Sequence, residues 1–222
     1  NSPEPFQPAP AGAGHNYYFR AVGGMLLSPD GKRLYLGVRG ARHSEKKPLV
    51  VYDLDEKGEP KGKPRAYAMG NFHLGISHLL LDPRASILYT IGWGGTGLFT
   101  MPLKNGEPAG DPQAYTFGYN AKSSMLPSDR FDCLIFAGQP ATVEVGDVTA
   151  AGDLETPVST FKFAESQEAV RLARVGRHLY FVKENKLWIW PLDKDWRPVD
   201  SPKPLPKMTA VGLWEGVHPF LY

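Results

Sequence analysis

The feature that most constrains the fold of this chain is a short motif that returns at near-regular intervals. A Leu-Tyr pair at 34–35 recurs at 88–89, at 134–135 as Leu-Ile, at 179–180 and at 221–222. The separations are 54, 46, 45 and 42 residues. Repeats of this length, built from short strands, are typical of a β-propeller in which each repeat forms one four-stranded blade. The sequence therefore predicts an all-β protein.

A second set of anchors supports the repeat. Glu59-Pro60 and Glu107-Pro108 lie 48 residues apart, as do Tyr67 and Tyr115. Each repeat contains apolar runs rich in Val, Leu and Tyr, bounded by Gly, Pro and Asp, which are strand and turn signals. Four complete four-stranded blades are expected, with strands at 25–28, 33–38, 49–54 and 65–69; 76–81, 87–91, 98–101 and 113–117; 122–126, 133–137, 142–148 and 158–163; and 170–173, 178–182, 186–190 and 204–208.

The two ends of the chain predict a partial fifth blade. Residues 16–20 resemble the closing strand of a blade, whereas 210–213 and 219–222 resemble a first and a second strand. Pairing the N-terminal strand into a blade opened by the C-terminus would latch the ring and cover exposed strand edges. The third strand of this blade is missing. The sequence leaves open whether the ring closes as five blades, one of them short, or whether the chain is a piece of a longer propeller.

The bulk composition suits one large all-β domain. The 222 residues are 42% hydrophobic and include 24 Gly and 21 Pro, which favours many turns and little helix. Charge is nearly balanced, with 25 basic against 23 acidic residues. The densest basic cluster, at 39–47, is interrupted by His and Glu and is best explained as a solvated loop, so no nucleic-acid partner is expected. The single cysteine, Cys133, is expected to be a small buried hydrophobe.

The N-terminal segment differs in composition from the rest. Residues 1–15 are rich in Pro, Ala and Gly and predict a linker or tail, which leaves 16–222 for the propeller domain. The sequence shows no signal peptide and no stretch of membrane-spanning length. A trimmed chain and a mature exported protein would both look like this, and we favour export to the periplasm or the cell exterior.

Two motifs carry a family resemblance. Residues 28–35 read Ser-Pro-Asp-Gly-Lys-Arg-Leu-Tyr, and 51–55 followed by Gly58-Glu59-Pro60 form a second element. Both resemble the repeats of YVTN-type and lactonase-like bacterial propellers, over about residues 16–208. TolB-type and dipeptidyl-peptidase propellers share the first motif, whereas the markers of WD-repeat (WD40) propellers are absent. The lactonase branch implies hydrolysis of sugar lactones, or the related ring-forming reaction, by acidic, basic and His groups at one mouth of the channel.

Propeller geometry selects the candidate site residues by position. Loops that enter the innermost strand of each blade, and loops that join its second and third strands, converge on one face. We predict His73 and Glu168 as catalytic residues, because a loop His and a nearby carboxylate could exchange protons near neutral pH. Predicted ligand-binding residues are Arg39, Asn71, His78, Trp93, Tyr119, Lys122, Glu165 and Trp214. His78 lies on an inner strand and would face either the channel or a neighbouring blade. No metal site and no cofactor is expected, since the six His lack ligand-like spacing.

Two functions from different classes follow from this reading. The first is a non-catalytic interaction module that binds a protein or a carbohydrate at its channel face, because no motif of a known catalytic arrangement is present. The alternative is a lactonase-like hydrolase or isomerase acting on a sugar lactone or a related small molecule at the channel mouth. Self-association is expected if one chain does not complete the ring.

Overall fold

The computed structural model of this chain describes residues 21–39, 47–69, 75–92, 97–116, 122–138, 141–162, 171–184 and 186–209. These residues form strands and turns, with no helix among them. The strands make four antiparallel sheets, here called sheets I to IV.

Each sheet is a meander in which consecutive strands pair, and the strand order follows the sequence. Sheet II has one variation, because β9 pairs with β7 beside the short β8. Sheet I contains β1 (Ala21–Leu27), β2 (Arg33–Arg39), β3 (Leu49–Leu54) and β4 (Pro60–Tyr67). Sheet II contains β5 (Ile76–Leu81), β6 (Ile87–Gly92), β7 (Gly97–Lys104), β8 (Glu107–Pro108) and β9 (Gln113–Thr116). Sheet III contains β10 (Lys122–Pro127), β11 (Cys133–Gly138), β12 (Thr142–Asp147) and β13 (Ser159–Lys162). Sheet IV contains β14 (Leu172–Val175), β15 (His178–Lys183), β16 (Lys186–Pro191) and β17 (Lys203–Thr209).

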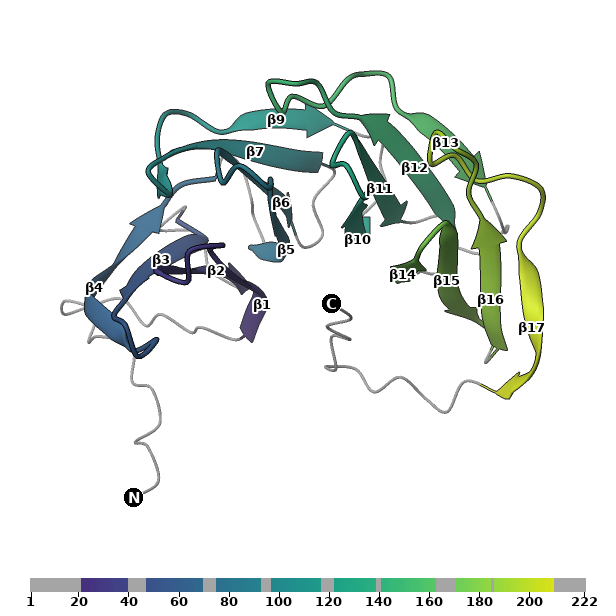
Figure 1. Ribbon diagram of the computed structural model, residues 1–222, viewed down its shortest axis with the longest axis horizontal. Helices are drawn as coiled ribbons and strands as arrows, with labels where there is room; N and C mark the ends of the chain where they lie inside the picture. The colour runs from purple at the N-terminus through teal and green to yellow at the C-terminus, as the bar shows by residue number, and fades with distance from the viewer. Residues whose placement is uncertain are drawn as a thin grey trace.

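The four sheets stand side by side around an open arc (Figure 1). The first strand of each sheet lies on the inside of the arc, and β4, β9, β13 and β17 lie on its perimeter. This radial arrangement confirms a propeller-like all-β fold. The predicted fifth blade falls on residues 16–20 and 210–222, which lie outside the described residues and so stay untested.

The turn between the first and second strands has the same backbone hydrogen bonds in sheets I, II and III, whereas sheet IV makes a tighter turn in which Val175 pairs with His178. In sheet I, the Ser28 hydroxyl donates to Asp30 (2.6 Å) and accepts from the Arg33 amide (2.9 Å). Ser128 of sheet III plays the same part, accepting from the Cys133 amide (3.2 Å). One residue of this turn takes a positive φ, and the chain fills it with Gly31, Ala85, Phe131 and Gly176. Gly adopts this conformation without steric cost, which is why Asp-Gly in sheet I is a legible turn signal.

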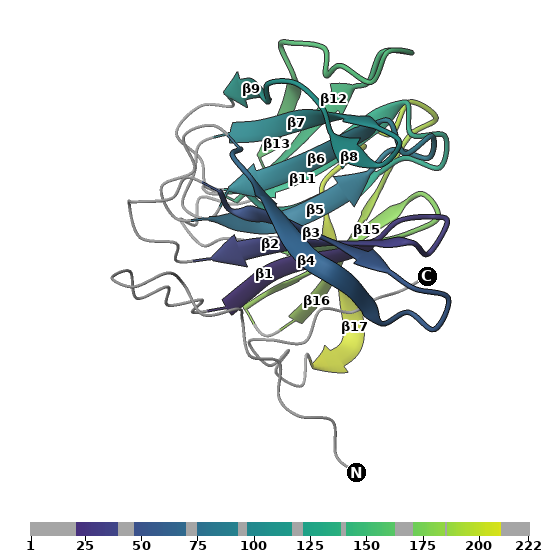
Figure 2. The same cartoon turned by 90° about the vertical axis from the view of Figure 1, so that its left-hand side faces the viewer.

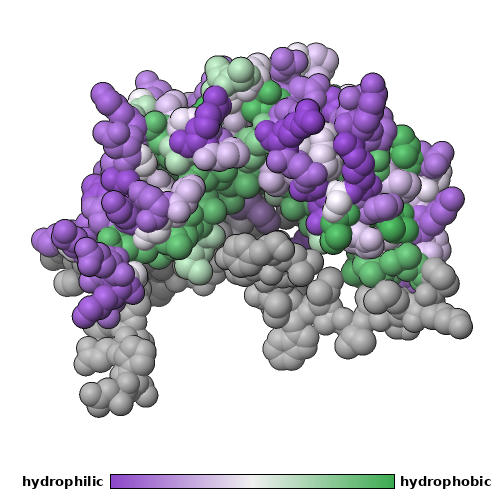
Figure 3. All heavy atoms as spheres, in the orientation of Figure 1, coloured by the Kyte–Doolittle hydropathy of each residue, from purple (hydrophilic) through white to green (hydrophobic). Residues whose placement is uncertain are grey.

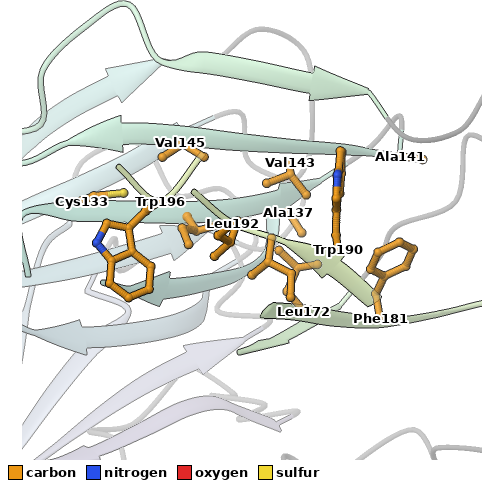
Figure 4. Packing of buried hydrophobic residues seen from close by; sticks show 12 residues of the cluster. Cys133, Ala137, Ala141, Val143, Val145, Leu172, Phe181, Trp190, Leu192 and Trp196 are labelled. Atoms are coloured by element: carbon orange, nitrogen blue, oxygen red, sulfur yellow. The ribbon is translucent and has the colours of Figure 1, made fainter. Parts of the chain in front are cut away.

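Hydrophobic side chains fill the spaces between neighbouring sheets. One face of sheet I packs on sheet II through Tyr35, Val51, Leu88 and others, and this is the first junction. The second junction joins sheets II and III, and the third joins sheets III and IV. In the third junction, Val143 and Val145 of β12 face Leu172, Trp190 and Trp196 (Figure 4). Polar side chains cover the perimeter of the arc, whereas apolar side chains lie between the sheets (Figure 3).

A hairpin reinforces each junction from the perimeter. The turn after the third strand of sheets II, III and IV reaches back onto the preceding sheet. The Tyr35 hydroxyl of sheet I donates to the Gly106 carbonyl in the hairpin of sheet II (2.7 Å). The Tyr89 hydroxyl of sheet II donates to the Gly152 carbonyl in the hairpin of sheet III (2.5 Å). In the third junction Trp196, at the same turn of sheet IV, packs beside Cys133 of sheet III instead.

Several strands depart from their predicted bounds, and β1 begins at Ala21 rather than at residue 25. β4 begins at Pro60 rather than at residue 65, because the hairpin extends through a polar stretch that has no apolar alternation. β14 begins at Leu172, two residues later than predicted. β17 carries Pro204 on the perimeter, as expected for an edge strand.

Candidate functional site

The candidate site is a rim at one end of the arc. Each inner strand begins beside the end of the second strand, as the pairs Ala21–Arg39, Ile76–Gly92 and Lys122–Gly138 show. In sheet IV, Leu172 near the start of β14 pairs with Phe181 near the end of β15. Seen from the side, β2 ends on the same side of the arc on which β5 begins (Figure 2). Segments from consecutive sheets therefore leave and enter this rim.

Three of the predicted site residues fall in described strands. Arg39 is the last residue of β2 and Lys122 is the first residue of β10, so the backbone of both lies at the rim. His78 is the third residue of β5. The rim thus brings Arg39 and Lys122 to one side of the arc, as propeller geometry requires.

The other seven predicted site residues lie outside the described residues, and their roles stay predictions. They are His73, Asn71, Trp93, Tyr119, Glu165, Glu168 and Trp214. Six of them belong to segments that directly precede β5, β10 or β14 or directly follow β6.

His78 is half-buried, and its neighbours in β5 show on which face of the strand its side chain lies. In β5, Leu79 packs in the first junction, whereas Leu80 packs in the second. Because side chains alternate along a strand, His78 shares the face of Leu80 and points toward sheet III. The open alternative from the sequence is thereby resolved in favour of the neighbouring sheet. A bulge between Ile76 and His78 sets this parity.

The inner strands of sheets I and II lie backbone to backbone beside His78. Gly24 of β1 occupies the matching position in sheet I, and a Cβ atom there would lie 3.3 Å from the Leu79 amide nitrogen and 3.4 Å from the His78 Cα. β1 also has a bulge, between Val22 and Gly24. A side chain at position 24 would push β1 and β5 apart, so Gly24 permits the close approach.

Sequence reasoning missed two buried polar residues near this rim. The Ser124 hydroxyl on β10 accepts a hydrogen bond from the Leu172 amide (3.1 Å) and ties the inner strands of sheets III and IV together. Glu144 on β12 is only 4% exposed and pairs across the strand with Phe136, which packs in the second junction. A carboxylate is almost never buried without a partner. The available signal was a Glu alternating with Val143 and Val145 in an apolar run.

Cys133 does not supply a nucleophile. Its side chain is buried in the third junction near Trp196 (Figure 4). Burial raises the pKa of the Cys133 thiol to about 12, and the nearby Arg197 only partly offsets this. The thiol is therefore neutral at physiological pH, which confirms the expectation of a small buried hydrophobe.

The main acidic cluster outside the rim is committed to structure. Arg65 donates to both carboxylate oxygens of Asp53 (2.8 and 2.9 Å) and to Glu107 (2.6 and 3.1 Å). Glu107 also accepts from Arg33 (3.0 Å) and Tyr67 (2.6 Å). Burial alone would raise the pKa of Glu107, but the hydrogen bonds from Arg65, Tyr67 and Arg33 outweigh it and lower that pKa. The hydrogen bond from Arg65 likewise lowers the pKa of Asp53. Through Glu107, this cluster holds sheet II against sheet I. Both carboxylates stay ionised, so they are poor proton donors.

Within the part of the chain that the structure describes, no three His, Cys, Asp or Glu side chains gather closely enough to hold a metal ion. Those same residues include no helix long and apolar enough to cross a membrane.

Comparison with known proteins places the fold in a class. No model of a known protein family matches the sequence. No curated protein matches it either. Among solved structures, a protein of Bacteroides uniformis assigned as a 6-phosphogluconolactonase matches with a TM-score of 0.65 and 13% identity, over 83% of this chain and 55% of its own. The periplasmic gluconolactonase of Pseudomonas aeruginosa, PpgL, matches with a TM-score of 0.62 and 17% identity, over 83% of this chain and 53% of its own.

These matches establish a lactonase-like, propeller-type β fold. The chain spans about half the length of the structures it matches. The lactonase-like part of the family resemblance is confirmed at the level of fold, whereas no family match supports the YVTN repeat itself. The expectation of a non-catalytic interaction module is contradicted, because the named neighbours are lactonases.

Proposed function

We propose that this chain forms part of a lactonase-like hydrolase that opens a sugar lactone at the rim of the arc. The observation that carries the proposal is the structural likeness to proteins named as gluconolactonase and 6-phosphogluconolactonase.

The rim supports the proposal through its charge. The backbone of Arg39 in sheet I and that of Lys122 in sheet III lie at this rim, and in the proposal both side chains face the lactone. Lactone hydrolysis develops negative charge on the carbonyl oxygen when water attacks, and fixed cations stabilise such an oxyanion. A sugar lactone carrying a phosphate would also bind to these two cations.

In this proposal, His73 acts as the general base and Glu168 handles the proton at the leaving oxygen. His73 takes a proton from the attacking water, which forms a bond to the carbonyl carbon. The ester bond to the ring oxygen then breaks, and Glu168 in its protonated form supplies the proton to that oxygen. The product is the open-chain hydroxy acid, and ring formation is the reverse of the same steps.

The test is hydrolysis of gluconolactone and 6-phosphogluconolactone by the folded chain. We expect turnover that falls by 10² or more in His73→Ala and in Glu168→Gln, in the range that general acid–base catalysis contributes. Glu155→Gln is the matched control, because Glu155 is an exposed carboxylate on the outer hairpin of sheet III, and it should keep wild-type turnover. A folded chain with no turnover above the uncatalysed rate contradicts the proposal. Turnover that survives in both site variants contradicts the residue assignment.

A further inference from the structure

At the two ends of the arc, sheets I and IV each have one face that no other described sheet covers, and both faces carry apolar side chains. In the described part of the chain, the large hydrophobic residues that are exposed lie on the innermost strands of these two sheets. Met25 and Leu27 on β1 are each 53% exposed, and Val175 on β14 is 56% exposed. Exposed apolar patches of this kind mark interaction surfaces.

The face of sheet I is the counterpart of a face that is used inside the arc. It carries Met25, Leu27, Leu34, Leu36 and Val50, which β-pairing places side by side. Adding 54 to the first three positions gives Leu79, Leu81 and Leu88 of sheet II, and those three residues pack against sheet I in the first junction. At its end of the arc, sheet I therefore exposes the same surface with which sheet II packs on sheet I.

The face of sheet IV is the complementary half of such a junction. It carries Val175, Tyr180, Val182, Leu187 and Ile189, with Tyr180 opposite Ile189 and Val182 opposite Leu187. Ile135 and Val145 hold the equivalent positions in sheet III, and both are fully buried against sheet IV. Sheet IV thus presents the surface onto which a following sheet docks.

The two free end faces also carry the two partners of the tyrosine–glycine hairpin contact, one on each face. Tyr180 is the sheet IV equivalent of Tyr35 and Tyr89, whose hydroxyls donate to Gly106 and Gly152 of the next sheet. Among the described residues, no hydrogen bond of the Tyr180 hydroxyl is found. Gly58 of sheet I holds the same hairpin position as Gly152, since the amide of each bonds the carbonyl three residues earlier. A Cβ atom on Gly58 would meet nothing within 4 Å, whereas one on Gly152 would lie 3.2 Å from the Tyr89 hydroxyl.

We propose that two copies of this chain associate head to tail, with sheet I of one copy docked on sheet IV of the other. Each junction buries Met25, Leu27 and Leu34 against Tyr180 and Ile189 and sets the Tyr180 hydroxyl against the Gly58 carbonyl of the second copy. Since both ends of each arc are then occupied, two copies close a ring with two identical junctions. Closure distinguishes this arrangement from an open filament, which a head-to-tail contact otherwise produces.

The first test is the mass of the chain in solution, measured by sedimentation over a range of concentrations. We expect a species of twice the 24.5 kDa mass of one chain. A folded wild-type chain that stays monomeric up to its solubility limit overturns the proposal and assigns both faces to sheets supplied by further polypeptide. A ladder of larger species overturns ring closure.

Two charge variants test the head-to-tail orientation. Leu27→Asp spoils the face of sheet I, and Ile189→Asp spoils the face of sheet IV, so each variant alone should be monomeric. An equal mixture of the two retains one intact junction and should form a 1:1 dimer, whereas a symmetric contact through like faces would not reappear on mixing. Ala114→Asp, on the exposed perimeter strand β9, is the matched control and should leave the wild-type dimer intact. A dimer that persists in both charge variants overturns the proposal.

A milder pair of variants covers the case in which the charge variants fail to fold. Tyr180→Phe should weaken the dimer about five-fold per junction, the loss expected for one hydrogen bond, without changing the unfolding of the monomer. Tyr35→Phe removes the equivalent bond inside one chain and should instead lower monomer stability. An unchanged dimer affinity in Tyr180→Phe contradicts the proposed docking register.

Discussion

The first and third junctions solve the same packing problem with different chemistry. At the first junction, Glu107 in the hairpin of sheet II is held by Arg33, Arg65 and Tyr67 of sheet I. At the third junction, the hairpin of sheet IV inserts Trp196, which is only 6% exposed and lies under the guanidinium groups of Arg174 and Arg177 (4.8 and 4.7 Å to the ring centroid). The backbone of the repeat therefore sets where a hairpin docks, and the side chain at its tip is free to be an ion or an aromatic ring.

The energetics of the two solutions should differ. A buried aromatic ring contributes through area removed from water, which salt does not screen. An ion-pair cluster whose members are roughly a third exposed loses part of its Coulomb attraction to solvent. We therefore expect the aromatic hairpin to stabilise its junction more than the ionic hairpin does, and the variants below can break this ranking.

The largest effect is expected for Trp196→Ala. Removing the buried ring should lower the free energy of unfolding by about 3 kcal/mol, as large-to-small substitutions of buried aromatic residues do. Urea unfolding followed by far-ultraviolet circular dichroism measures this loss. Trp196→Phe is the matched control and should lose clearly less, since it keeps a ring in the same space. A loss below about 1 kcal/mol in Trp196→Ala would reverse the ranking of the two junctions.

The next effect is expected for Glu107→Gln. An amide keeps the shape of the side chain but cannot pair with two guanidinium groups, so we expect a loss of about 2 kcal/mol at neutral pH. Glu59 holds the matching hairpin position in sheet I and is exposed, so Glu59→Gln should change stability by less than about 0.5 kcal/mol. Both are measured where the chain is monomeric. Equal losses in the two variants would show that the Glu107 cluster contributes nothing specific.

A smaller effect is expected at the second junction, where the hairpin of sheet III is held by a tyrosine hydroxyl and not by an ion-pair cluster or a buried tryptophan. Tyr89→Phe removes the hydroxyl that donates to the Gly152 carbonyl and should cost about 1 kcal/mol. Thermal unfolding by calorimetry is a sufficient readout, with Tyr35→Phe as the parallel variant at the first junction. No loss in either variant would mean that the shared hairpin contact only accompanies the packing.

The smallest effect is a dependence of stability on pH, which distinguishes the ionic first junction from the aromatic third junction. The pKa values of Asp53 and Glu107 lie below their ordinary values of 3.8 and 4.5 in the folded chain. Their stabilisation is therefore fully present above about pH 4.5 and is lost as the pH falls through the lower folded values. The stability difference between wild type and Glu107→Gln should shrink on acidification below pH 4.5, whereas the effect of Trp196→Ala should persist. A Glu107→Gln difference that is constant down to pH 3 contradicts the ionic account.

The sequence predicts the repeat and the second strand of each repeat well because both rest on local signals. Alternating Leu, Val and Tyr mark strands such as β2 and β6, and Asp-Gly marks the first turn. Trp190 and Trp196 both pack between sheets, in the third junction. The perimeter strand β4 was misplaced, since its Pro-Lys-Gly-Lys-Pro-Arg start is exposed and has no periodic pattern.

The candidate site is less legible because it depends on contacts between distant repeats. Strand order alone brings Arg39 and Lys122 to one rim, so their placement follows from the repeat. The face of β5 on which the His78 side chain lies does not follow from the repeat. The bulge at Ser77 changes the face on which each later residue of β5 lies. Glu107 was recognised only as part of a turn marker, and nothing local indicates that Arg33 and Arg65, 74 and 42 residues away, would meet it.

The serial order of the junctions has a consequence for how the chain opens. Since the main contacts of each described sheet are with the sheets next to it, the structure behaves as a short linear array. Sheets II and III are held on two sides and sheets I and IV on one, so loss of structure should begin at either end and travel inward. Amide protons in β6, β7, β11 and β12 should then exchange with solvent most slowly, and the gradient should flatten once the two outer faces are covered.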